Sequence, residues 1–184
     1  MSDSIAYWRA EHANFAHLLD LLEKNLAAFH TDSPPDYEAM LDIIEYLRHF
    51  PDRYHHARED VAFARLEKRK PQLAPILARL REEHQSIGKS GEALRTMLTA
   101  AAEDAIVSRQ DIENAARDYL AAYRNHIATE ELNVMPHAGS LLTDEDWAEV
   151  ARATPSVPDP LFGAHADESY RELRRRIASN QPAA

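Results

Sequence analysis

Two short stretches of the sequence place a histidine and a glutamate four residues apart: His55 with Glu59, and His126 with Glu130. Positions i and i+4 lie on the same face of a helix, so each stretch would direct one imidazole and one carboxylate the same way. Two such pairs in one chain predict a binuclear metal site between helices. In this interpretation the carboxylates bridge the ions and the imidazoles complete their coordination.

Two more histidines complete the candidate site. His12 and His84 stand in runs of apolar residues spaced alternately by three and four, a pattern typical of the inner face of a helix bundle. Carboxylates without partners are very costly to bury, so two inward-facing glutamates require cations. Imidazole together with carboxylate suits Fe, Zn or Mn better than Ca or Mg. The predicted metal ligands are His12, His55, Glu59, His84, His126 and Glu130.

The other histidines are predicted to have solvated or outer roles. His56 is turned by about 100° from His55 on a helix, away from the predicted inner face. The rest stand off the apolar stripes or near helix ends: His17, His30, His49, His137 and His165. A lone histidine–glutamate pair is commonly a surface ion pair. Two pairs, together with His12 and His84 on inner stripes, favour the metal site instead.

The apolar periodicity predicts the elements that position these side chains. Alanine, leucine, glutamate and arginine dominate long runs, with only 4 glycines and with 10 prolines gathered between the runs. The fold class is all-α, an antiparallel up-down-up-down four-helix bundle with short C-terminal helices. The long helices are expected near residues 4–30, 34–70, 73–98 and 108–135, and Pro51 should kink or briefly interrupt the second. We assign residues 1–140 to the bundle and 141–184 to a C-terminal helical extension packed on it.

Composition excludes several classes of protein. The chain of 184 residues has no cysteine, so neither a disulfide framework nor a thiolate metal site is available. Its formal net charge of −10 argues against a nucleic-acid partner. No apolar run approaches the roughly 20 residues that span a bilayer, and the N-terminus lacks a signal-peptide pattern. A cytoplasmic protein with no membrane partner is expected.

Several short motifs resemble those of the hemerythrin-like family, the HHE cation-binding domain. They are Glu11-His12, His55-His56-x-x-Glu59, Glu83-His84, His126-x-x-x-Glu130 and the following Pro136. The resemblance covers residues 4–136, and residues 159–163 resemble an extension seen in bacterial members.

This resemblance implies a four-helix bundle around a non-haem di-iron centre, two Fe ions with an oxo or hydroxo bridge. Glu59 and Glu130 would bridge the irons. His12 and His55 would complete one iron, and the remaining two histidines the other. Zn or Mn are possible substitutes for iron.

One position departs from the oxygen carriers of that family, which have a further histidine one turn after the equivalent of His84. Here that position is Gly88. The resemblance therefore favours relatives involved in iron-centre repair or nitric-oxide response over simple oxygen carriage. Gly88 and Gly91 indicate either a cavity for a small ligand or close helix packing. Tyr123, one turn before His126, could hydrogen-bond a bound oxygen species or simply pack in the core.

The function expected from these observations is a metal-binding di-iron protein that binds or senses O2 or NO, or handles iron. Two alternatives stay open: a di-iron enzyme acting on peroxide or NO, and a zinc-loaded structural bundle. The interpretation as a binding protein rather than an enzyme is preferred. The expected partner is a small diatomic ligand or peroxide, and a homodimer is also considered.

Overall fold

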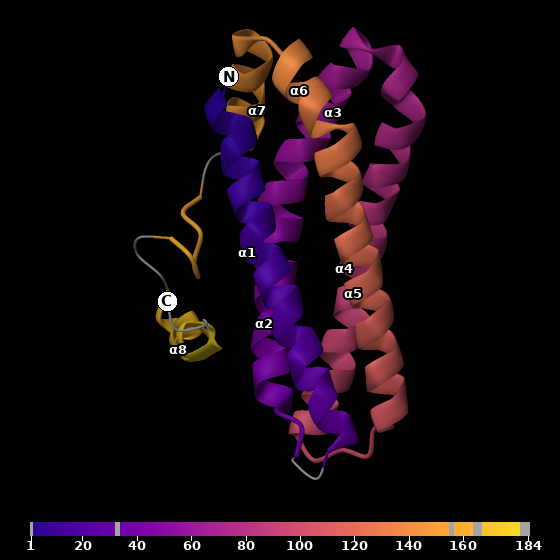
Figure 1. The fold of residues 1–184 in the computed structure, drawn as a ribbon, viewed down its shortest axis with the longest axis vertical. Coiled ribbons are helices and arrows are strands. Elements are labelled where there is room, and N and C mark those ends of the chain that lie inside the picture. Colours follow the sequence, from indigo (N-terminus) through magenta and orange to yellow (C-terminus); the bar gives the residue numbers. More distant parts are fainter. Residues whose placement is uncertain (1, 32–33, 155–156, 164–166, 181–184) are drawn as a thin grey trace.

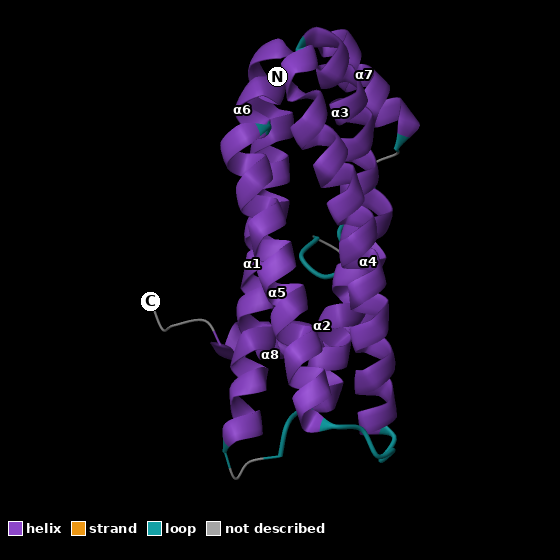
Figure 2. Cartoon of the chain, turned by 90° about the vertical axis from the view of Figure 1, so that its right-hand side faces the viewer, coloured by secondary structure: helices purple, strands orange, loops and turns teal. Residues whose placement is uncertain are grey.

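The computed structural model describes residues 2–31, 34–154, 157–163 and 167–180. Within these ranges the regular elements are all helical and no strand is present, which confirms the predicted all-α class (Figures 1 and 2). Among these helices, none is long and apolar enough to cross a membrane.

Four long helical stretches lie side by side and form the body of the molecule (Figure 1). They are α1 (Ser2–Ala27); α2 (Tyr37–Phe50) continued through a π-helical segment (Pro51–His55) into α3 (His56–Arg69); α4 (Ala74–Ala102); and α5 (Arg109–Asn133).

Contacts between α1 and α5 show that these two helices run in opposite directions. At one end of the bundle, His30, just after α1, bonds Glu113, near the start of α5 (2.9 Å). Towards the other end, His12, early in α1, bonds Glu131, late in α5 (3.2 Å). Residues early in one helix therefore meet residues late in the next, which brings distant parts of the sequence to one level.

The helix starts follow from local hydrogen bonds. The Asp36 carboxylate accepts a bond from the Ala39 backbone N–H (2.9 Å), so α2 begins at Tyr37, slightly later than predicted. Ser108 caps α5 in the same way, accepting from the Asp111 N–H (3.2 Å). Each side-chain oxygen satisfies a backbone donor that the first turn of a helix leaves without a partner.

The disturbance expected at Pro51 is a π-helical segment. Proline has no backbone N–H and its ring clashes with the preceding turn, so a regular α-helix is not favoured there. The chain adopts the wider π turn, in which the His56 N–H bonds the Pro51 carbonyl five residues earlier. The chain continues as a helix through Pro51, and the segment ends at His55, the first of the predicted ligands on this stretch.

The apolar core is divided into two clusters along the bundle. One contains Phe15, Phe50 and Ile87, and the other contains Trp8, Ala62 and Leu80. The predicted metal ligands stand between them in the sequence of each long helix: His12, for example, lies between Trp8 and Phe15. A polar layer therefore crosses the bundle between two hydrophobic layers.

The C-terminal elements pack on the outside of the bundle. The helix α6 (Met135–Leu141) directly follows α5, and α7 (Asp144–Ala153), capped by Thr143, packs on α3 through an Arg69–Asp146 ion pair (2.5 Å). The last helix, α8 (Arg171–Asn180), pairs Arg176 with Asp36 at the start of α2. The assignment of residues 141–184 to a separate extension stays a prediction.

One hydrogen bond ties the segment before α8 to the bundle. The Tyr46 hydroxyl, buried on α2, donates to Asp159 Oδ2 (2.8 Å). The other carboxylate oxygen of Asp159 accepts from the backbone N–H groups of Leu161 and Phe162 (both 2.8 Å). The Asp159 carboxylate thus organises the turn and attaches it to α2.

We predict that this bond contributes measurably to stability. In a double-mutant cycle of Tyr46→Phe and Asp159→Ala, followed by urea unfolding, the coupling free energy should be about 1 kcal/mol, the net value of one buried hydrogen bond. Each single variant should still bind metal, because the bond lies away from the polar layer. Additive effects of the two substitutions would contradict the prediction.

Candidate metal centre

The six predicted ligands lie together between the four long helices, and all are buried, at most 7% exposed. His12 comes from α1, His55 from the end of the π-helical segment and Glu59 from α3. His84 comes from α4, and His126 and Glu130 come from α5. The antiparallel arrangement brings these positions, far apart in the sequence, to one level of the bundle.

The Glu59 carboxylate spans two groups of imidazoles. Its Oε1 lies 3.1 Å from His55 Nε2 and 3.5 Å from His12 Nε2. Its Oε2 lies 3.5 Å from His84 Nε2. One carboxylate therefore offers one oxygen to each side of the site.

Glu130 spans the same two sides. Its Oε1 lies 3.2 Å from His126 Nε2 and 3.4 Å from His84 Nε2, and its Oε2 lies 3.4 Å from His12 Nε2. The two carboxylates thus face each other across a space bounded by His12 and His55 on one side and by His84 and His126 on the other.

An outer carboxylate holds the far nitrogen of each of these four rings. His55 Nδ1 donates to Glu11 (2.7 Å) and His12 Nδ1 to Glu131 (3.2 Å). His84 Nδ1 donates to Asp60 (3.0 Å) and His126 Nδ1 to Glu83 (3.1 Å). Since a carboxylate can only accept, Nδ1 carries the proton and Nε2 presents its lone pair to the centre. Metal-binding histidines are oriented in this way in proteins.

The outer carboxylates were not among the site residues predicted from the sequence. A signal was available, because Glu11, Asp60, Glu83 and Glu131 each stand directly beside a predicted ligand in the sequence. However, each bonds a histidine on a neighbouring helix rather than its own neighbour in sequence. That pairing follows from the arrangement of the helices.

The unpartnered atoms at the centre fit a bound cation. His84 Nε2, His126 Nε2, Glu59 Oε2 and both carboxylate oxygens of Glu130 are buried without a hydrogen-bond partner. The Nε2 atoms of His12 and His55 lie only 2.9 Å apart. Two ligand nitrogens at right angles on one ion, each at about 2.1 Å, are about 3 Å apart. The arrangement therefore suits metal coordination, and a metal-binding cluster is present.

The same groups hold protons when no cation is present. Burial disfavours the charged ring of His55, but the Glu59 carboxylate and the bond to Glu11 outweigh it and raise the His55 pKa to about 9. For His84, burial is likewise outweighed, by the bond to Asp60 and the nearby carboxylates of Glu130 and Glu59, which raise its pKa to about 11. Protons and metal ions therefore compete for one set of atoms.

His56 is placed differently from the prediction. It is buried, only 3% exposed, and its ring stacks on that of His84 with centroids 4.3 Å apart and planes 11° from parallel. The buried face of α3 is broad rather than a single line of positions, and it also includes Glu59, Ala62 and Phe63. His55 therefore faces α1 while His56 faces α4. Of the two roles predicted for His56, solvated or outer, its burial contradicts the solvated one.

Gly88 and Gly91 mark close packing rather than open space. A Cβ at Gly91 would lie 3.1 Å from Arg48 Cγ and 3.2 Å from Tyr119 Cε2. A Cβ at Gly88 would lie 3.3 Å from the Asp52 carboxylate, which occupies the space facing it. Of the two alternatives left open by the sequence, the structure supports close packing at both positions.

Tyr123 lies beside the centre and is fully buried. Its ring centroid is 6.0 Å from that of His56 and 6.5 Å from that of His126, and its hydroxyl has no hydrogen-bond partner. A hydroxyl buried without a partner is costly unless another group at the centre accepts a hydrogen bond from it. A role toward a bound species stays a prediction.

The remaining histidines lie outside the cluster. His30 and His49 are exposed or nearly so, and His137 contacts Lys70 Nζ (3.1 Å). His17 is half-buried, and His165 lies outside the residues that the structure describes.

Aromatic side chains pack against two of the predicted ligands, His55 and His84. Phe15 meets the His55 ring edge-on (5.1 Å between centroids), and Phe63 stacks on His84 (5.9 Å). The ring centroids of Trp8 and His55 lie 6.2 Å apart.

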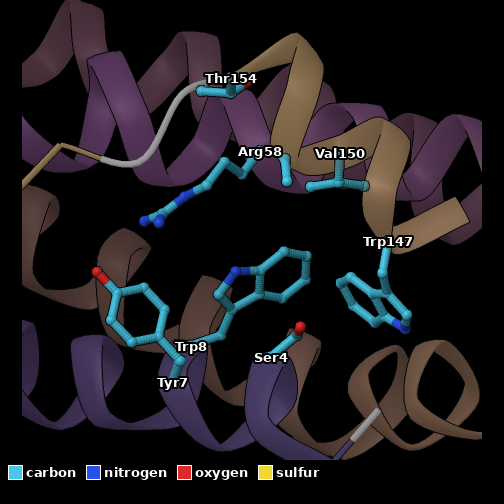
Figure 3. Close-up of a pocket in the computed structure, with 8 residues that line it drawn as sticks. Ser4, Tyr7, Trp8, Arg58, Trp147, Val150 and Thr154 are labelled. Atoms are coloured by element: carbon cyan, nitrogen blue, oxygen red, sulfur yellow. The ribbon is translucent and has the colours of Figure 1, made fainter. Parts of the chain in front are cut away.

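A surface recess of about 410 Å³ lies beyond Trp8 (Figure 3). Trp8, Arg58 and Trp147 line it, whereas none of the six predicted ligands is among its described lining residues. Arg58 connects the recess to the site, because it donates two bonds to Glu11, which holds His55 (2.7 and 2.8 Å to the two oxygens). The recess therefore reaches the site only indirectly among its described lining residues, through the bonds from Arg58 to Glu11.

Comparison with protein families agrees with the geometry. The family model for the Hemerythrin HHE cation binding domain matches residues 3–138, a range that includes all six predicted ligands. A search among curated proteins gave no match.

We predict that the outer carboxylates tune metal affinity. Glu83→Gln removes the charge that orients His126 and should weaken metal binding roughly 10- to 100-fold, as loss of such partners does in other metal sites. Glu82→Gln, an exposed neighbour on the same helix, is the matched control and should leave affinity unchanged. Titration with a competing chelator measures both, and equal affinities in the two variants would contradict the role of Glu83.

Proposed function

Since this chain belongs to the hemerythrin HHE cation-binding domain family, we propose that it holds two iron ions and binds a small ligand, O2 or NO, at them. In this proposal the protein carries, senses or scavenges the ligand and is not primarily an enzyme. The main support for this proposal is the pair of carboxylates, Glu59 and Glu130, each of which offers one oxygen to each pair of histidines.

That arrangement supports two ions rather than one. His12 and His55 with one oxygen from each glutamate supply four donors for the first ion. His84 and His126 with the other two oxygens supply four donors for the second. The buried carboxylates require compensation by cations, and the two separate donor sets support two of them.

The donor set supports iron as the metal. Nitrogen and carboxylate oxygen donors suit iron, zinc and manganese, and the absence of cysteine excludes thiolate sites. Four donors complete the usual coordination of structural zinc. Iron commonly takes more ligands, so positions remain for exchangeable ones, and the metal would there supply redox chemistry and binding of a diatomic molecule.

The surroundings support a small ligand. The ligating side chains are buried, and aromatic rings cover them on several sides, so a bulky substrate has no direct access. The Tyr123 hydroxyl, buried and without a partner, is available to hydrogen-bond a species bound at the centre.

Metal analysis combined with absorption spectra tests the proposal. Protein loaded with iron and exposed to air should contain two irons per chain and show near-ultraviolet charge-transfer bands that azide shifts, and anaerobic NO should change the spectrum of the reduced protein. One metal per chain, or tight binding of two zinc ions with no response of iron-loaded protein to azide or NO, would overturn it.

We predict that Glu130→Ala abolishes binding of at least one ion, because both sides of the site lose an oxygen donor. The metal-to-protein ratio should fall, while circular dichroism should show the helical content retained. Glu82→Ala, at an exposed position of α4, should keep the wild-type ratio. Full occupancy by two ions in Glu130→Ala would show that Glu130 does not bridge.

We also predict that metal stabilises the fold. A ligand that binds only the folded chain adds about 2.7 kcal/mol of stability when its free concentration is 100 times its Kd. The thermal midpoint should therefore rise on addition of Fe(II) under nitrogen and return on chelation. An unchanged midpoint would contradict tight binding by the folded protein.

A further inference from the structure

We propose that His56 is a fifth imidazole ligand, bound to the ion that His84 and His126 hold. The inference deepens the proposed two-ion centre and rests on it. It gives a specific role to a buried histidine outside the set of six.

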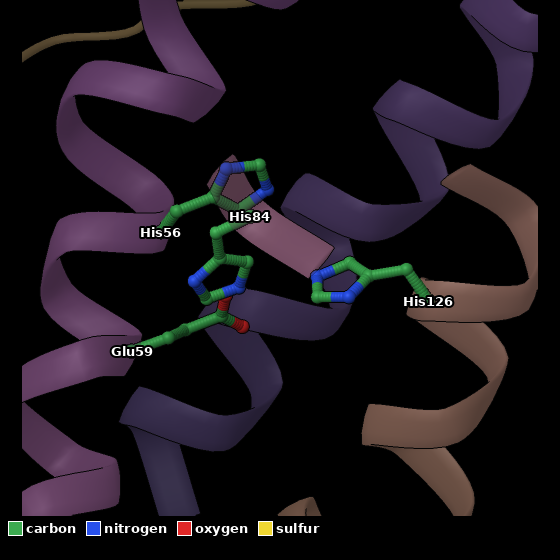
Figure 4. Close-up of side chains that lie close together, drawn as sticks. All are labelled: His56, Glu59, His84 and His126. Atoms are coloured by element: carbon green, nitrogen blue, oxygen red, sulfur yellow. The ribbon is translucent and has the colours of Figure 1, made fainter. Parts of the chain in front are cut away.

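The first support is the grouping of the ligand atoms. One ligand atom from each of His56, Glu59, His84 and His126 lies within 4.8 Å of all the others (Figure 4). Two ligands on opposite sides of one ion, each at about 2.1 Å, stand about 4.2 Å apart. Shifts of a few tenths of an ångström therefore place all four around one ion. The four side chains converge from α3, α4 and α5.

The second support is the carboxylate at the far nitrogen. His56 Nδ1 lies 3.3 Å from Asp52 Oδ1, one turn earlier. The other four histidines have a similar placement, with Nδ1 hydrogen-bonded to an outer carboxylate at 2.7 to 3.2 Å, whereas the His56–Asp52 contact is longer and is not a hydrogen bond. The Asp52 carboxylate lies on the Nδ1 side of the His56 ring, so Nε2 is the nitrogen left for the metal.

The third support is the space opposite Gly88. A Cβ at that position would lie 3.3 Å from Asp52 Oδ2, so a larger side chain there would displace the Asp52 carboxylate that faces His56. The small residue one turn after His84 is thus explained by a side chain that arrives from α3. The second ion gains its third imidazole from the helix on the other side of His84.

A packing role for His56 is the alternative, because its ring stacks on His84. The two roles differ in one respect: packing requires a flat ring, and ligation requires a donor atom. His56→Phe keeps the ring and removes the donor, while His56→Glu removes the ring and keeps a donor.

Cobalt(II) substitution tests the assignment without relying on activity. Each histidine bound through Nε2 to paramagnetic Co(II), with its Nδ1 proton held by a carboxylate, gives one strongly shifted exchangeable proton signal. Protein with two Co(II) ions should show five such signals, and His56→Phe should show four. His56→Phe should also bind the second Co(II) at least tenfold more weakly, and His56→Glu should recover most of that affinity. His49→Gln, at an exposed position, should keep five signals and the wild-type affinity.

The outcomes separate this assignment from the proposed function. Wild-type protein with two Co(II) ions and only four signals, unchanged in His56→Phe, would overturn the role of His56 and leave the two-ion centre intact. Loss of affinity in both His56→Phe and His56→Glu, with four signals in the wild type, would assign His56 to packing. A wild-type protein that binds fewer than two Co(II) ions would overturn the two-ion centre, and this assignment with it.

Discussion

Two carboxylates at the centre of a helix bundle impose the constraint that the rest of this structure meets. Glu59 and Glu130 are each only 1% exposed, and burying charge without compensation is very unfavourable. Imidazoles surround them, and hydrophobic clusters enclose the polar layer above and below. A cation at the centre converts this costly layer into a stabilising one, which is why metal binding and folding are coupled in such a protein.

The outer hydrogen bonds connect the centre to the fold. Glu11 on α1 bonds His55, Asp60 on α3 bonds His84, Glu83 on α4 bonds His126, and Glu131 on α5 bonds His12. Each bond joins two neighbouring long helices, and together they form a closed ring around the bundle. A shift of one helix would therefore misalign imidazoles on two sides. The orientation of the ligands and the packing of the helices depend on each other.

The stretch from Asp52 to Glu59 shows how local distortion and chemistry are linked. Pro51 starts a π-helical segment that ends at His55, and α3 begins at His56. Asp52 in that segment then faces both His56 and the bare backbone of Gly88. Distortions of this kind occur frequently at functional sites, because they direct side chains in ways that a regular helix does not. Here two consecutive histidines contact two different neighbouring helices: His55 contacts α1 and His56 contacts α4.

The fold class and the six buried side chains of the candidate site could be predicted from the sequence, because apolar periodicity reports which face of a helix is buried and His55–Glu59 and His126–Glu130 follow that face. It did not predict the burial of His56, since spacing locates the middle of a buried face but not its width. Nor did it predict which outer carboxylate holds which histidine: Glu11 stands beside His12 in the chain but bonds His55. These points depend on the distance and direction between neighbouring helices, which the pattern of the sequence does not specify.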